Sequence, residues 1–120
     1  MKVCDAIERV DEIRPNAFSE ERKLEWISVL EGQIMADVLE LPPEQLAEET
    51  FKYPDDMDRE LLAKWPHDAM YVQLLMAKID EANGEYDKYA NSMEVFNAAY
   101  ENFVHWFLVN RDKAWGGAGG

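Results

Sequence analysis

The sequence is poor in cysteine and in long apolar runs. Its 120 residues contain one cysteine, Cys4, so no disulfide can form within the chain and a reducing compartment is expected. No stretch approaches 18 consecutive apolar residues, which argues against a transmembrane helix. The opening MKVCDAIERVDE has charges every few positions and no apolar core. We therefore expect no signal peptide and a protein that is intracellular when made.

Basic residues are also scarce. Lysine and arginine number 12 against 25 acidic residues, which gives a net charge of −13. A surface this negative repels phosphate backbones and anionic membranes, so it predicts neither specific nucleic-acid binding nor membrane binding. It suits high solubility, or a partner that presents basic patches.

Apolar side chains recur at helical spacing in four segments, which predicts an all-α fold. The predicted helices span residues 3–13, 20–41, 66–83 and 85–113. Ser19 is placed to cap the second helix, and Pro42 and Pro43 are expected to end it. Asn83 and Gly84 form a stop signal after the third helix, because both residues tolerate a left-handed backbone.

These elements predict one domain over residues 1–113, a small antiparallel bundle of about four helices with a long C-terminal helix. Between the second and third helices lies an irregular acidic loop or arm, residues 42–64. A short helical turn near residues 44–49 and an extended arm through residues 51–54 are both possible there. Residues 114–120 are rich in glycine and are expected to form a flexible tail.

The last predicted helix carries a regular seam of large side chains. Their spacing alternates between three and four residues: Tyr86, Tyr89, Met93, Phe96, Tyr100, Phe103 and Phe107. This pattern keeps the seam on one helix face, and we expect most of it to pack on the second and third helices. Val104, Trp106 and Leu108 lie outside the seam and widen the apolar surface near the end of the helix. We expect part of that end to meet another chain.

No arrangement of residues predicts a catalytic, cofactor or metal site. Glu101 and His105 share a helix face, but the paired Glu-x-x-His motifs of a di-iron bundle are missing. We expect His105 to be a partly buried ring beside Trp106, and His67 to be a cap or surface residue. Cys4 has no partner that the sequence assigns, so an inert thiol is expected.

Acidic pairs suggest one enzymatic alternative. Glu21 with Glu25, or Glu8 with Asp11, could bind magnesium as in all-helical nucleotide pyrophosphohydrolases. That chemistry requires carboxylates that converge from two helices, whereas these acids have the spacing typical of a solvated helix face. We therefore predict a protein that is not an enzyme. A second alternative is an acidic binding module that mimics DNA.

Two segments carry a resemblance to a known family. Residues 5–34, DAIERVDEIRPNAFSEERKLEWISVLEGQI, place two helices around a Pro-Asn turn. Residues 65–107 contain a proline, a tyrosine-containing helix, an Ala-Lys-Ile-Asp step, an Asn-Gly turn and the pattern YxxYxNSMxxFNAAYxxF. In this order they resemble the head–tail connectors of tailed phages and prophages, the head-completion adaptors encoded just after the major capsid gene. The likeness covers about 70 of the 120 residues, whereas residues 42–64 match only loosely.

The resemblance implies a homo-oligomeric ring, with a dodecamer as the expected assembly, that joins the portal protein to tail-completion proteins. DNA would pass through its centre without specific binding. The protein would be found in the bacterial host cytoplasm during assembly and then at the head–tail junction of the virion. Contacts are expected from aromatic residues in irregular or terminal segments: Phe51, Tyr53, Trp65 and Trp115. The alternative for each, with Phe51 and Trp65 foremost, is a lid over the core.

Overall fold

The computed structural model describes residues 1–114, with side chains described up to residue 111. The α-helices are α1 (Val3–Ile13), α2 (Glu20–Asp37), α3 (Pro43–Glu48), α4 (Ala69–Ala82) and α5 (Tyr86–Ala114), and a short 3-10 turn covers Asp55–Asp58. No strand occurs in this part of the chain. The all-α prediction is therefore confirmed, with α3 added to the four helices expected.

The first two helices begin at side-chain caps. The backbone N–H of Lys2 donates to the Asp5 carboxylate of α1 (2.9 Å), and Ser19 accepts from the N–H of Arg22 in α2 (3.1 Å). These bonds satisfy N–H groups that have no partner within the helix. The predicted cap at Ser19 is confirmed.

The second helix ends earlier than predicted. It stops at Asp37, and Glu40 takes a left-handed backbone conformation (φ 56°) that turns the chain. The N–H of Leu41 then donates to the carbonyl of Met35 (3.0 Å). Pro43 is the first residue of α3, where its fixed φ suits a helix start. The two prolines therefore open a new helix and do not end the old one.

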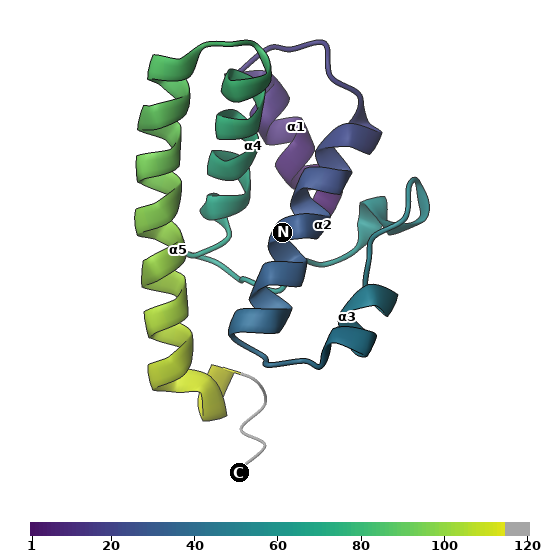
Figure 1. The fold of residues 1–120 in the computed structure, drawn as a ribbon, viewed down its shortest axis with the longest axis vertical. Helices are drawn as coiled ribbons and strands as arrows, with labels where there is room; N and C mark the ends of the chain where they lie inside the picture. The colour runs from purple at the N-terminus through teal and green to yellow at the C-terminus, as the bar shows by residue number, and fades with distance from the viewer. Residues whose placement is uncertain (115–120) are drawn as a thin grey trace.

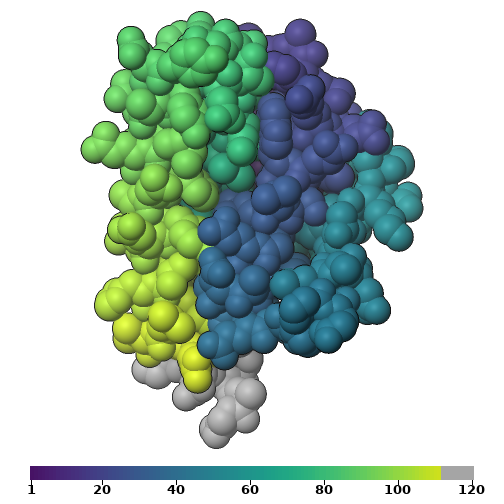
Figure 2. Space-filling view, in the orientation of Figure 1, coloured from purple at the N-terminus to yellow at the C-terminus, as the bar shows by residue number. Residues whose placement is uncertain are grey.

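Helices α4 and α5 form a hairpin (Figure 1). The turn lies at Asn83 and Gly84 as predicted, with Gly84 in the left-handed region (φ 72°). α4 also contacts α1 and α2, so it lies at the centre of the bundle. Farther along α5, the Tyr100 hydroxyl donates to Asp37 at the end of α2 (3.3 Å), and Figure 2 shows these two helices packed together at the surface.

The aromatic seam is buried over most of its length. Phe96, Phe103 and Phe107 are buried, and Tyr89, Met93 and Tyr100 are partly covered. Tyr86 is 69% exposed, because it is the first residue of α5, beside the turn that follows α4. The seam is thus mainly part of the core, as expected.

The acidic arm folds back onto the bundle. Phe51, Leu61 and Ala63 are buried, whereas most of the acidic side chains of the arm point to solvent. The end of the arm lies against the start of the chain, where Val3 N–H donates to the Arg59 carbonyl (3.1 Å) and Leu61 N–H to the Met1 carbonyl (3.0 Å). The short helical turn considered for residues 44–49 is α3.

Candidate functional site

Several of the predicted contact residues are exposed. Trp65 is 84% exposed, and Trp106 and Leu108 are also exposed, as is Val109, which the sequence analysis did not single out. We call Trp65, Trp106, Leu108 and Val109 the exposed apolar set. Val104 is half-buried against the core. Trp115 lies outside the described residues.

The two aromatics of the arm lie in different surroundings. Phe51 covers the core, and the Arg59 guanidinium lies 4.3 Å from the centre of its ring. Its backbone N–H donates to the Ser28 hydroxyl of α2 (3.0 Å). Tyr53 is exposed, and its hydroxyl donates to Glu20 (3.4 Å). Phe51 therefore covers the core, as the lid alternative predicted, whereas the indole of Trp65 is exposed to solvent.

The predictions for the two histidines are wrong, because His67 and not His105 is the partly buried ring beside Trp106. His67 is half-buried, with its ring centre 5.0 Å from that of Trp106 and 5.7 Å from that of Phe103. His105 is exposed. Trp106 lies on the face of α5 that contacts His67. Since neighbouring helix residues point in different directions, the His105 side chain faces solvent. His67 thus fixes Trp106 by packing against it.

A buried polar cluster joins α2, α4 and the arm. Glu31 accepts hydrogen bonds from the Tyr71 hydroxyl and from the backbone N–H of Leu62 (2.9 Å), and the Tyr71 oxygen accepts from Ala63 N–H (2.9 Å). Burial raises the pKa of Glu31 above its ordinary value, although both hydrogen bonds counteract the shift. Burial and the nearby Glu31 carboxylate also raise the pKa of Tyr71. The hydrogen bonds to Leu62 and Ala63 hold the arm on the bundle. Because Glu31 and Tyr71 are buried, a substrate cannot reach their side chains.

The raised pKa of Glu31 predicts a pH-dependent stability. A carboxyl group with a higher pKa in the folded than in the unfolded chain binds protons more tightly when folded. The contribution of Glu31 to the free energy of unfolding is therefore most favourable below the ordinary glutamate pKa of about 4.3. This contribution declines as the pH rises above that value. We expect the difference in unfolding free energy between wild type and Glu31→Gln, measured by urea denaturation, to fall from pH 3 to pH 8. A difference that rises with pH would refute this assignment.

A second buried charge lies at the α4–α5 hairpin. Asp80 is fully buried, accepts from Arg14 Nη1 (2.8 Å) and accepts from the Ser92 hydroxyl (3.0 Å). It thereby ties the end of α1 to both hairpin helices. Lys23 is also buried and pairs with Asp11 (2.6 Å). These contacts are structural, and each acid already has a protein partner.

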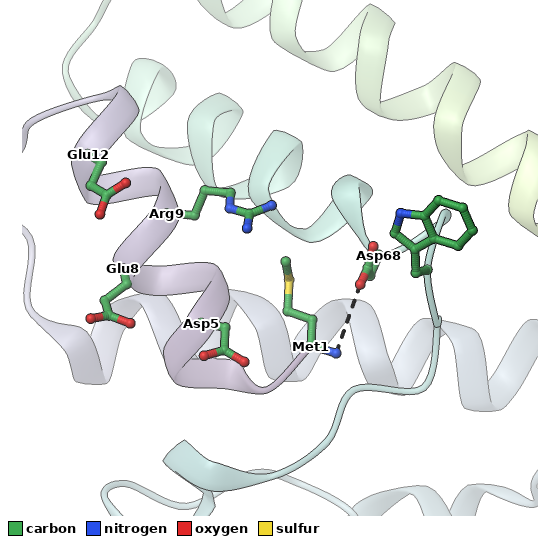
Figure 3. A pocket seen from close by; sticks show the side chains of 7 residues that line it. Met1, Asp5, Glu8, Arg9, Glu12 and Asp68 are labelled. Atoms are coloured by element: carbon green, nitrogen blue, oxygen red, sulfur yellow. Dashed lines mark ion pairs between the residues drawn. The ribbon is translucent and has the colours of Figure 1, made fainter.

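An open cavity of about 400 Å³ lies along one face of α1. Its lining includes acidic and basic groups and one indole: Met1, Asp5, Glu8, Arg9, Glu12, Trp65 and Asp68. Figure 3 shows the α1 side chains of this cavity, with the N-terminal amine drawn toward Asp68 (3.9 Å). Such a lining attracts cationic groups in general, because its four carboxylates outnumber its two cationic groups, Arg9 and the N-terminal amine.

The residues considered for metal or thiol chemistry do not converge. Glu21 and Glu25 are exposed, and Asp11 is engaged by Lys23. Within residues 1–111 no three histidine, cysteine or acidic side chains are grouped to hold a metal ion. Burial and the nearby Asp5 and Asp58 carboxylates raise the pKa of Cys4, which lowers its thiolate fraction.

Comparison with protein-family models, with curated proteins and with solved structures found no match. None of the helices described combines the length and the apolar composition that a membrane span requires. The described residues form an all-α bundle.

Proposed function

We propose that this protein is a structural head–tail connector of a tailed phage or prophage, and that it assembles into a homo-oligomeric ring joining portal and tail components. The observation that carries the proposal is the exposed apolar set. Exposed apolar side chains that lie together, as Trp106, Leu108 and Val109 do within about one turn of α5, are typical of surfaces that bind another protein. The sequence resemblance over residues 5–34 and 65–107 supplies the kind of assembly.

The distribution of charge supports self-association through this part of the molecule. Charged residues make up 31% of the chain, yet the sixteen residues 95–110 contain one, Glu101. Two copies that each carry a net charge of −13 repel each other wherever their acidic faces meet. A nearly uncharged helix segment is therefore the surface at which copies can approach at the lowest electrostatic cost.

The acidic arm suits the passage of DNA. Exposed acids cluster on and near it, among them Glu44, Glu48, Asp55, Asp58 and Glu60. If the arm faces the channel of the ring, these carboxylates make no counterion-releasing contacts with phosphates, and a duplex slides past them. A ring whose channel is lined by this arm therefore conducts DNA without binding it.

Concentration-dependent self-association is the expected result for the isolated protein. In sedimentation velocity at about 0.15 M salt, where long-range repulsion is screened, the sedimentation coefficient of the wild type should rise with protein concentration. The double variant Leu108→Glu/Val109→Glu adds carboxylates to two exposed positions and should associate at least about tenfold more weakly.

Val29→Glu is the matched control. Val29 is 71% exposed on α2, outside the exposed apolar set, so the same substitution there should leave self-association close to that of the wild type. A wild-type protein that stays monomeric up to about 1 mM would contradict the proposed self-association.

A further inference from the structure

The side chain of His67 lies against a member of the exposed apolar set. Its ring centre is 5.0 Å from that of Trp106 and 5.7 Å from that of the buried Phe103. His67 belongs to the turn before α4 and is itself half-buried. Histidine is the side chain whose charge ordinarily changes between about pH 5 and pH 8. A titratable ring therefore supports an indole of the proposed contact surface.

No acidic side chain of its own segment pairs with the His67 ring. Within the described residues, that ring makes neither an ion pair nor a side-chain hydrogen bond. Asp68, next in the chain, lies 3.9 Å from the N-terminal amine. Glu60 accepts from the same amine and pairs with Lys64 (3.6 Å). The first turn of α4 contains no acidic residue, so a positive charge on the ring has no carboxylate partner.

α5, which contacts the ring, supplies no countercharge to it. The sixteen residues 95–110 contain one charged residue, Glu101, and it is exposed. Glu101 comes two positions before Phe103, about 200° around the helix from the ring that contacts His67. His105 is exposed as well and can add only positive charge. Copies that approach through this segment, as proposed above, therefore bring no more than one carboxylate each to the contact.

We propose that His67 is a pH-sensitive switch of self-association, and that its protonation weakens the contact between copies. This rests on the proposed function and specifies how the same surface is regulated. A neighbouring copy that covers Trp106 removes water from the half-buried ring beside it. Loss of hydration disfavours a charged group far more than a neutral one, and no carboxylate compensates the imidazolium here. Association therefore favours the neutral ring, and acid favours the separate copies.

The attraction between an imidazolium and the Trp106 ring does not reverse this direction. A cation close to an indole is attracted by the electrons of the ring. However, His67 contacts Trp106 within one molecule, so the contact needs no neighbouring copy. The attraction is present in the free and in the associated protein, and it cancels from the difference between them.

Acidification also acts on the chain as a whole, in the opposite direction. Most carboxylates remain ionised down to about pH 5.5, but any decrease of the net charge of −13 lowers the repulsion between copies. This general effect strengthens association. A dissociation constant that increases on acidification therefore reports a specific group at the contact.

Sedimentation velocity at pH 8 and pH 5.5, in about 0.15 M salt, tests the switch. The wild-type dissociation constant is expected to be at least about fivefold higher at pH 5.5. His67→Gln and His67→Phe each replace the ring by a side chain that cannot be protonated, and phenylalanine keeps an aromatic ring against Trp106. Neither variant should show an increase of the dissociation constant at pH 5.5.

His105→Gln is the matched control. His105 is the other histidine of the chain and directly precedes Trp106, but it is exposed. This variant should retain the pH dependence of the wild type. Circular dichroism at both pH values shows whether the proteins compared are equally folded.

The outcomes separate this inference from the proposed function. Self-association whose pH dependence is the same in the wild type and in a folded His67 variant overturns the inference and leaves the connector proposal standing. Loss of the pH dependence in His105→Gln assigns the switch to the wrong histidine and also overturns it. A wild-type protein that stays monomeric at both pH values overturns both.

Discussion

Replacing Arg14 by alanine is expected to lower the free energy of unfolding by about 3 kcal/mol. The guanidinium is the only cationic partner of Asp80 within the described residues, at 2.8 Å, and Asp80 is fully buried. Without Arg14, the carboxylate keeps only the Ser92 hydroxyl as a side-chain partner. Breaking a buried pair in this way typically destabilises by about 3–5 kcal/mol, and partial exposure of Arg14 places this case at the lower end.

The measurement is urea denaturation followed by circular dichroism, compared with Lys88→Ala. Lys88 pairs with Glu85 at 3.5 Å, and both side chains are largely exposed, so its removal should change stability by less than about 0.5 kcal/mol. Equal effects of the two substitutions would show that the Arg14–Asp80 pair does not hold the end of α1 to the hairpin.

Phe103→Ala is expected to have the largest effect of any change in the aromatic seam, a loss of about 3–5 kcal/mol. Phe103 is 1% exposed and packs against the rings of His67 and Phe107. Alanine leaves a cavity that these rings cannot fill without moving. Since His67 also packs on Trp106, the substitution should loosen the support of that indole.

Tyr86→Ala is the matched control, because Tyr86 belongs to the same helix and the same sequence pattern but is mostly exposed. Its substitution should cost less than about 0.5 kcal/mol in the same denaturation experiment. A Phe103→Ala variant that stays within 1 kcal/mol of the wild type would argue against the hairpin packing described above.

The periodic parts of the fold could be predicted from the sequence because local rules govern them. The cap at Ser19, the Asn83-Gly84 turn and the seam of α5 each depend on residues close together in the chain. The predicted end of α2 at residue 41 is wrong because the prolines at 42 and 43 fit a helix start as well as a stop. The turn that decides between the two is the left-handed conformation at Glu40, which no residue type in that stretch signals.

The buried charges and an apolar groove between α4 and α5 depend on contacts between distant segments. Glu31 lies four residues after Ile27 and three before Ile34, and this place on the apolar stripe of α2 indicates that its side chain is buried. Its partners at Leu62 and Tyr71 could not be read in this way. Of the predicted contact residues, Tyr53, Trp65, Trp106 and Leu108 are exposed. The apolar groove lined by Gln73, Met76 and Val95, in contrast, arises only when α4 and α5 are placed side by side.

The hydrogen bonds that anchor the arm restrict the backbone motion of Trp65. On one side the backbone of residues 1–3 pairs with Arg59 and Leu61, and on the other Glu31 and Tyr71 hold Leu62 and Ala63. Two residues of chain, Lys64 and Trp65, separate this clamp from the pyrrolidine of Pro66, so the indole is presented with little backbone freedom left to lose. A ligand that captures it is spared the entropic penalty of ordering a loop, which favours slow dissociation over fast exchange.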